Sequence, residues 1–188
     1  MAEPETKPTL LINLAKKGNQ QGSEKIKSFP FSADCRARIL ILGSMPGAES
    51  LRQQQYYAHP RNLFWEFMND LFGAGRELPY EERLSVLRDN GVALWDVAHT
   101  CRREGSLDAN MTEVEANDFQ SLFALAPNIH SIFFNGQKAA KLFKKLVFPN
   151  LDKKTALVSL PSTSPANASI SKTEKIKAWN QIQRACID

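Results

Sequence analysis

The chain has 188 residues, of which 43% are hydrophobic and 23% are charged, with 24 basic and 20 acidic side chains. This length predicts one globular domain whose core needs no disulfide or metal. The three cysteines Cys35, Cys101 and Cys186 form no C-x-x-C pair, which argues against a disulfide scaffold and a four-cysteine zinc or iron–sulfur site. No apolar run is long enough to cross a bilayer, and the N-terminus lacks a signal-peptide core and cleavage site. Together with the cysteine spacing, this leads us to expect a reducing compartment, most simply the cytoplasm.

The charges are unevenly distributed along the chain. Residues 1–136 carry 14 basic and 17 acidic side chains, whereas residues 137–188 carry 10 basic and 3 acidic side chains. A basic C-terminal third is compatible with a polyanionic partner, because each neutralised phosphate releases counterions. On charge alone, a solvated lysine face is the simpler interpretation.

Residues 1–28 are polar and Lys-rich, which predicts a flexible N-terminal arm before a single domain over residues 29–188. Within that domain, four continuous apolar runs predict strands covered on both faces, at residues 38–43, 92–97, 131–135 and 156–160. Amphipathic patterns between and after them predict helices at residues 62–72, 80–88, 118–125, 137–146 and 171–185. The last helix opens with Ser171 and Glu174, the spacing of a capping box.

Strands that alternate with helices require crossover connections. The sequence therefore predicts an α/β fold, namely a three-layer αβα sandwich with a mainly parallel four-stranded central sheet. Ligands of such sheets bind beyond the carboxyl ends of the strands. The segments that follow the predicted strands are rich in polar and turn-forming residues, at positions 43–62, 96–110, 135–137 and 161–167.

The first of these segments begins with the loop GSMPG, residues 43–47. Its glycines allow backbone N–H groups to approach a ligand, and its proline fixes the turn. The loop is neither a Walker A loop nor a dinucleotide-binding fingerprint.

Longer motifs are more specific. Residues 43–65 read GSMPGAESLRQQQYYAHPRNLFW, residues 106–111 read SLDANM, and residues 160–167 read LPSTSPAN. Over about residues 29–185, the sequence resembles the uracil-DNA glycosylase superfamily, and within it the hypoxanthine-DNA glycosylase (DNA-deoxyinosine glycosylase) family.

The resemblance implies a monofunctional DNA repair hydrolase that cleaves the N-glycosidic bond of deaminated bases in DNA, chiefly hypoxanthine, and leaves an abasic site. It implies no cofactor, no metal and no membrane partner, and a monomer. Two other functions stay open: a uracil- or mismatch-specific glycosylase with the same pocket, and a non-catalytic nucleic-acid-binding module with the same fold.

The resemblance assigns catalysis to Asn62 and stacking of the flipped base to Tyr57. A carboxamide cannot take a proton efficiently, but it can orient water and hydrogen-bond the departing base. Asn62 would also make a good cap for the helix that follows it. Tyr57 could instead be a core aromatic at the sheet edge, and the neighbouring Tyr56 leaves open which ring faces the pocket.

Other residues would line the base pocket. Asp96 ends a strand where relatives read the base; alternatively, it could fix its loop through Thr100 or Arg102. His59 could brace its own loop or assist the leaving group. The remaining pocket residues on this interpretation form the glycine-containing loop: Gly43, Ser44, Met45, Pro46 and Gly47.

Two positions depart from other branches of the superfamily. Several branches carry Asp, Glu or Asn at the position of Met45 to hold the attacking water, which a thioether cannot do. The most active uracil-specific branch has a histidine at the position of Leu160. The first departure makes efficient excision of uracil less expected, and the second reduces electrostatic help for an anionic base.

Contacts to the DNA backbone are assigned to the last loop and to one helix. The hydroxyls and amides of Ser162, Thr163 and Ser164 suit phosphate, although the same residues would form an ordinary polar turn. Lys138 lies at the start of a predicted helix, where N-terminal amides attract phosphate. A solvent-facing role for the lysines of this helix is the alternative.

Overall fold

The computed structural model describes residues 25–103, 110–150 and 155–187. At its centre, four strands form a parallel sheet in the order β3-β2-β6-β7. The strands are β2 (Ile39–Gly43), β3 (Val92–Asp96), β6 (Ser131–Asn135) and β7 (Ala156–Leu160). The predicted four-stranded parallel sheet is confirmed, and each strand matches its apolar run to within one residue.

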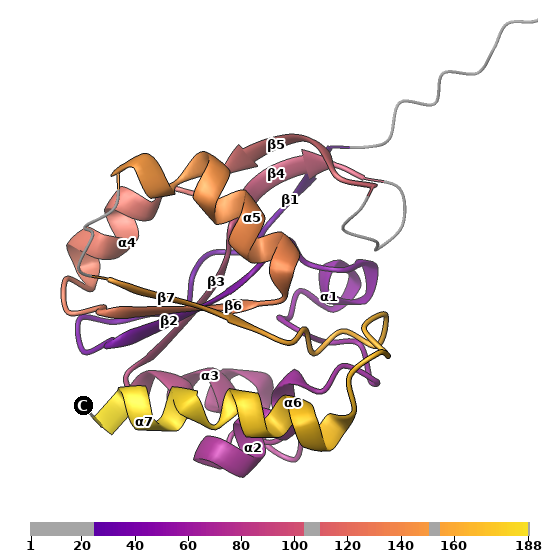
Figure 1. Cartoon of the computed structure of the whole chain (residues 1–188), viewed down its shortest axis with the longest axis vertical. Helices are drawn as coiled ribbons and strands as arrows, with labels where there is room; N and C mark the ends of the chain where they lie inside the picture. The colour runs from indigo at the N-terminus through magenta and orange to yellow at the C-terminus, as the bar shows by residue number, and fades with distance from the viewer. Residues whose placement is uncertain (1–24, 104–109, 151–154, 188) are drawn as a thin grey trace, which may run out of the picture.

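Helices cover both faces of the sheet and complete the predicted sandwich (Figure 1). One face carries α2 (Phe64–Phe72), α3 (Tyr80–Asp89), α6 (Lys172–Trp179) and α7 (Gln181–Ile187). The other carries α4 (Phe119–Leu125) and α5 (Gln137–Leu146), which is followed by the short 3-10 helix η2 (Phe148–Asn150). This double cover explains why Ile39 to Leu42 are fully buried and apolar without alternation. Within the described ranges, no helix is long and apolar enough to cross a membrane.

A second, antiparallel sheet was not predicted. It has the strand order β1-β4-β5 and consists of β1 (Lys25–Lys27), β4 (Ala98–Arg102) and β5 (Thr112–Ala116). Strand β1 falls inside the predicted arm of residues 1–28, yet Ile26 pairs with Cys101 of β4. The folded domain therefore includes residues 25–28, whose backbone is satisfied by pairing, and residues 1–24 lie outside the described part.

The helix boundaries follow local capping chemistry. Ser171 and Glu174 form the expected capping box, but the predicted helix 171–185 is divided at Asn180 into α6 and α7. Asp118 caps α4 by accepting from the N–H of Ser121. The short helix α1 (Ala48–Gln53), within a segment expected to be loop, was missed.

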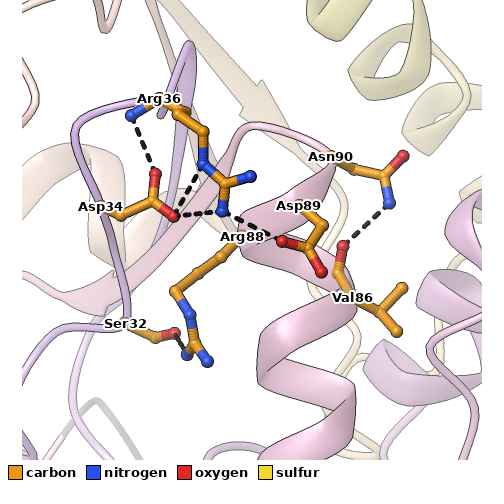
Figure 2. A network of polar contacts seen from close by, with 7 residues as sticks. All are labelled: Ser32, Asp34, Arg36, Val86, Arg88, Asp89 and Asn90. Atoms are coloured by element: carbon orange, nitrogen blue, oxygen red, sulfur yellow. Dashed lines mark hydrogen bonds and ion pairs between the residues drawn. The ribbon is translucent and has the colours of Figure 1, made fainter.

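Figure 2 shows a polar network just before strands β2 and β3 begin, at the end of the sheet opposite their carboxyl termini. Arg36 contacts both Asp34 (2.7 Å) and Asp89 (3.0 Å), which ties the segment before β2 to the end of α3. Arg88 donates to Ser32 Oγ at 3.0 Å. The Arg36 side chain is well exposed, so this network contributes little to stability but fixes how the segments meet.

Trp179 anchors α6 beneath the loop that follows β7. Its ring is fully buried against Phe64 and Phe67, and its Nε1 donates to the carbonyl of Pro161 at 2.9 Å. We expect Trp179→Ala to lower the free energy of unfolding by about 3–5 kcal/mol, because a large cavity and an unpaired carbonyl remain. Urea denaturation measures this change. Leu125→Ala, at an exposed position, is the control and should stay within about 0.5 kcal/mol; an equally small loss for Trp179→Ala would contradict the predicted anchoring role.

Candidate active site

A cavity of about 610 Å³ lies at the carboxyl ends of the parallel strands. Gly43 ends β2, Asp96 ends β3 and Asn135 ends β6, and all three line it together with the loop after β7. This is the edge where such sheets bind ligands. Every residue predicted for catalysis or base contact lies in its wall: Gly43, Ser44, Met45, Pro46, Gly47, Tyr57, His59, Asn62 and Asp96.

Gly43 is required by the close approach of two side chains. A Cβ atom at this position would lie 2.2 Å from Asp96 Oδ1 and 2.9 Å from the Tyr57 hydroxyl oxygen. Asp96 is itself buried, with 2% of its surface exposed, so it has little room to move away. The glycine therefore lets a carboxylate and a phenol meet at the floor of the cavity.

The two neighbouring tyrosines have different surroundings. Tyr56 is buried, and its hydroxyl donates to the carbonyl of Pro30 at 3.1 Å. Burial, with a smaller effect of the Asp96 carboxylate, raises the pKa of Tyr56. Tyr57 is only half-buried, and its ring stacks on Phe64 with centroids 4.0 Å apart. Tyr57 is thus the more available of the two rings, with Phe64 as a rigid support.

Asn62 lines the cavity and also caps a helix. Its Oδ1 accepts from the backbone N–H of Phe64 at 3.0 Å, the first residue of α2. Helix α2 thus begins two residues after the predicted start, and Leu63 occupies the formal N-cap position. The capping oxygen fixes the orientation of the amide, and Nδ2 has no hydrogen-bond partner among the described residues.

Asp96 is held by the segment that precedes β2. Its Oδ2 accepts from Ser28 Oγ at 3.1 Å, and its backbone carbonyl accepts from Asn117 Nδ2 at 2.9 Å. The alternative partners considered from sequence have other contacts, because Thr100 donates to Glu115 and Arg102 donates to Glu113. A carboxylate so placed can accept a hydrogen bond from a ligand in the cavity.

The loop of residues 161–167 is built around Thr163. This residue is fully buried: its N–H donates to Asn135 Oδ1 at 2.9 Å, and its hydroxyl accepts from Asn135 Nδ2 at 2.8 Å. Its carbonyl accepts from the N–H of Leu63 at 3.1 Å. Ser162 and Ser164 flank it and are more exposed. The Thr163 side chain therefore holds the loop. Ser162 Oγ accepts from the N–H of Ser164, and Ser164 Oγ accepts from the N–H of Ala166, as in a polar turn.

Asn135 was not singled out from the sequence, although it lies in one of the segments after a strand. The next residue, Gly136, allows Asn135 to lie close to the loop after β7. Gly136 has a φ of 96°, which is unfavourable for other residues, and a Cβ at this position would lie 2.9 Å from Ser162 Cβ. In the sequence, only the FNG segment, a strand end followed by a glycine, could have indicated Asn135 as a site residue. The buried Arg103 was missed as well; its Nη2 donates to the carbonyl of Pro46 behind the GSMPG loop.

His59 and Glu49 complete the polar wall. His59 Nδ1 accepts from the N–H of Arg61 at 3.1 Å, which agrees with a role in bracing the loop. Glu49, missed from the sequence, hydrogen-bonds Arg52 and Gln53, and these contacts lower the pKa of its carboxyl to about 2. Such a carboxylate is a weak base near neutral pH.

Some predicted features lie elsewhere. Lys138 does not line the cavity; it lines a second groove between α5 and β5 with Lys141 and Lys145. Most of the SLDANM motif, residues 106–109, lies outside the described residues. In the described ranges, no group of three or more His, Cys, Asp or Glu side chains is arranged to hold a metal ion.

The fold is an αβα sandwich whose parallel sheet carries a cavity at its carboxyl edge, lined by an oriented amide, an aromatic ring and a polar loop. Residues 29–183 match the family model of the uracil DNA glycosylase superfamily, and the chain belongs to this superfamily.

Named relatives narrow the comparison. A hypoxanthine DNA glycosylase of Methanosarcina acetivorans is 38% identical over 159 residues, which cover 84% of this chain and 98% of the relative. A hypoxanthine DNA glycosylase of Methanosarcina barkeri is 40% identical over 118 residues, covering 62% of this chain and 75% of the relative. The solution NMR structure of a candidate uracil DNA glycosylase from M. acetivorans superposes with a TM-score of 0.74 at 35% identity, covering 88% of this chain and all of the other.

Gly43→Ala tests the packing at the cavity floor. We expect it to lower the free energy of unfolding by about 1–3 kcal/mol, because the new methyl group overlaps Asp96 Oδ1. The double variant Gly43→Ala/Asp96→Ala should lose less than the sum of the two single variants, since the carboxylate that clashes is gone. Urea denaturation of the four proteins gives the coupling. Strictly additive losses would show that the two residues do not meet.

Proposed function

We propose that this protein hydrolyses the N-glycosidic bond of hypoxanthine in DNA and leaves an abasic site. One observation carries the proposal: Asn62 and Tyr57 line the same cavity, which also contains the loop of residues 161–167. The cavity volume of about 610 Å³ can admit one flipped nucleotide. The two Methanosarcina relatives named hypoxanthine DNA glycosylase support this choice of base.

Base recognition is assigned to Tyr57 and Asp96. The Tyr57 ring, stiffened by Phe64, would stack on the extruded base, an interaction that tolerates any base. Asp96 would then accept a hydrogen bond from the N1–H of hypoxanthine. Adenine has no hydrogen at N1 and could not donate this hydrogen bond to Asp96, which disfavours the normal base.

Asn62 would promote bond cleavage without acting as a base. In the reaction, the oxygen of water bonds to C1′ of the deoxyribose, the bond from C1′ to the base nitrogen breaks with its electron pair going to the base, and a water proton is released. The Phe64 N–H engages Oδ1, so Nδ2 can donate to the departing base or to the attacking water. Met45 at the cavity wall can do neither.

The DNA backbone would be held by Ser162 and Ser164, with Lys138 adding positive charge near the start of α5. Contacts of this kind position a duplex without reading its sequence. Because Thr163 is buried and its hydroxyl contacts Asn135, we assign Thr163 to support of this loop; its predicted phosphate contact is not retained.

The direct test is cleavage of an inosine-containing duplex, scored as strand breaks after alkali treatment. We expect breaks at the inosine position and fewer at uracil placed in the same sequence, because Met45 cannot hold the attacking water as Asp, Glu or Asn would. An unmodified adenine duplex is the control. Breaks chiefly at uracil would favour the uracil-specific alternative, and binding without breaks on every duplex would favour a non-catalytic module.

Substitutions of Asn62 separate its two roles. Asn62→Ala removes both the capping oxygen and the amide, so it should lower the free energy of unfolding by about 0.5–2 kcal/mol and slow cleavage at least about 100-fold. Asn62→Asp keeps an oxygen for the Phe64 N–H but lacks the donor and places negative charge beside the leaving base. We expect wild-type stability for Asn62→Asp with a similar loss of single-turnover cleavage. Unchanged cleavage by Asn62→Ala would remove the assigned role.

A further inference from the structure

Arg76 contacts both ends of the loop that carries the two assigned active-site residues. It lies in the segment between α2 and α3, and its Nη2 is 3.2 Å from the Tyr57 carbonyl oxygen and 3.2 Å from the Asn62 carbonyl oxygen. The same nitrogen lies 2.9 Å from the His59 carbonyl oxygen, and Nη1 lies 3.4 Å from that of Ala58. One guanidinium thus joins four backbone carbonyls of a single loop.

The loop needs such support because its backbone is strained. Tyr57 has a φ of 54°, in the left-handed region that a tyrosine rarely adopts, at a cost of about 1–3 kcal/mol. Such a conformation persists only where the surroundings impose it. Tyr56 on its N-terminal side is held by Tyr80 and Trp65, since its N–H donates to the Tyr80 hydroxyl oxygen and its carbonyl accepts from Trp65 Nε1. Arg76 is the contact that spans from Tyr57 to Asn62.

The side chain of Arg76 is suited to this task and is not engaged elsewhere. Guanidinium presents five N–H donors in one plane and stays charged at every physiological pH. None of the ion pairs between described residues includes Arg76, so its donors serve the backbone and not a carboxylate. A lysine has one shorter-reaching ammonium group and could not contact the same set of oxygens.

We propose that Arg76 is a positioning residue for base excision, which holds the Tyr57 ring and the Asn62 amide at the spacing that one flipped base requires. The proposal rests on the proposed function of the cavity. Arg76 acts through the backbone of these two residues and does not contact the base. Losing it should therefore slow the chemical step much more than it weakens DNA binding.

The test compares Arg76→Ala and Arg76→Lys with Arg36→Ala, which removes an arginine from the network at the opposite end of the sheet (Figure 2). On an inosine duplex under single-turnover conditions, we expect Arg76→Ala to cleave about 10- to 100-fold more slowly, with a dissociation constant within about threefold of wild type. Arg76→Lys should be intermediate, and added guanidinium should restore part of the rate of Arg76→Ala. Arg36→Ala should cleave at the wild-type rate.

Three results would overturn the proposal: an unchanged rate for Arg76→Ala, a loss confined to the dissociation constant, or an equal loss of rate in Arg36→Ala. If Arg76→Ala does not fold, the rate of Arg76→Lys decides by the same criteria.

A second readout separates this proposal from the proposed function. If the wild-type protein leaves inosine intact, the assignment of the reaction fails, and amide hydrogen exchange then tests Arg76. Faster exchange over residues 57–64 in Arg76→Ala than in Arg36→Ala supports positioning of the loop, and equal exchange overturns it.

Discussion

Three hydrogen bonds at one buried residue hold the walls of the cavity together. Thr163 donates to Asn135, accepts from Asn135 and accepts from the N–H of Leu63, and none of its surface is exposed. Each of these groups would cost about 1–3 kcal/mol if left buried and unpaired. The end of β6, the loop after β7 and the start of α2 therefore have one shared arrangement, because a shift of any one leaves the others unsatisfied.

At the start of α2, the Asn62 side chain also combines a structural hydrogen bond with a group that faces the cavity. Its Oδ1 accepts from the first helical N–H, that of Phe64, and this hydrogen bond fixes the orientation of Nδ2. The structural and the chemical roles weighed from the sequence are therefore compatible in one side chain. Its neighbour Leu63 is the residue bonded to Thr163, so the proposed catalytic amide and the proposed phosphate loop are connected through a single residue.

Features that depend on local pattern were predictable from the sequence. The four parallel strands are continuous apolar runs because both faces are covered, and the capping box at Ser171 follows from side chains three residues apart. The antiparallel sheet was not predictable in the same way, since strand β5 consists of largely exposed residues without an apolar run. Helix α1 was missed because it has only six residues and lies in a segment rich in polar and turn-forming residues. The resemblance to a glycosylase family predicted most residues that line the cavity, because the motifs of that family lie on the loops after the strands.

The supports of those loops could not be read from sequence. Asn135, Arg103 and Arg76 each bond to a segment distant in the chain, and nothing in their local sequence specifies the partner. For Lys138, the sequence predicts the position at a helix start, and only the structure shows that its side chain lines a groove separate from the cavity. Motifs identify which loops carry chemistry, and only long-range contacts show how the loops are held.

The charges around the cavity limit how the proposed reaction can be accelerated. Met45 cannot activate water, and the Glu49 carboxyl, with a pKa of about 2, is a poor proton acceptor. If Asp96 reads N1–H as proposed, its carboxylate would also repel the negative charge that develops on a departing base, so discrimination against adenine would reduce stabilisation of the leaving group. The proposed reaction would then be accelerated mainly by neutral donors held in the correct geometry. In the proposed site, the strained Tyr57, the Asn62 amide oriented by the Phe64 N–H, and the Arg76 guanidinium that bridges their backbone carbonyls would supply that geometry.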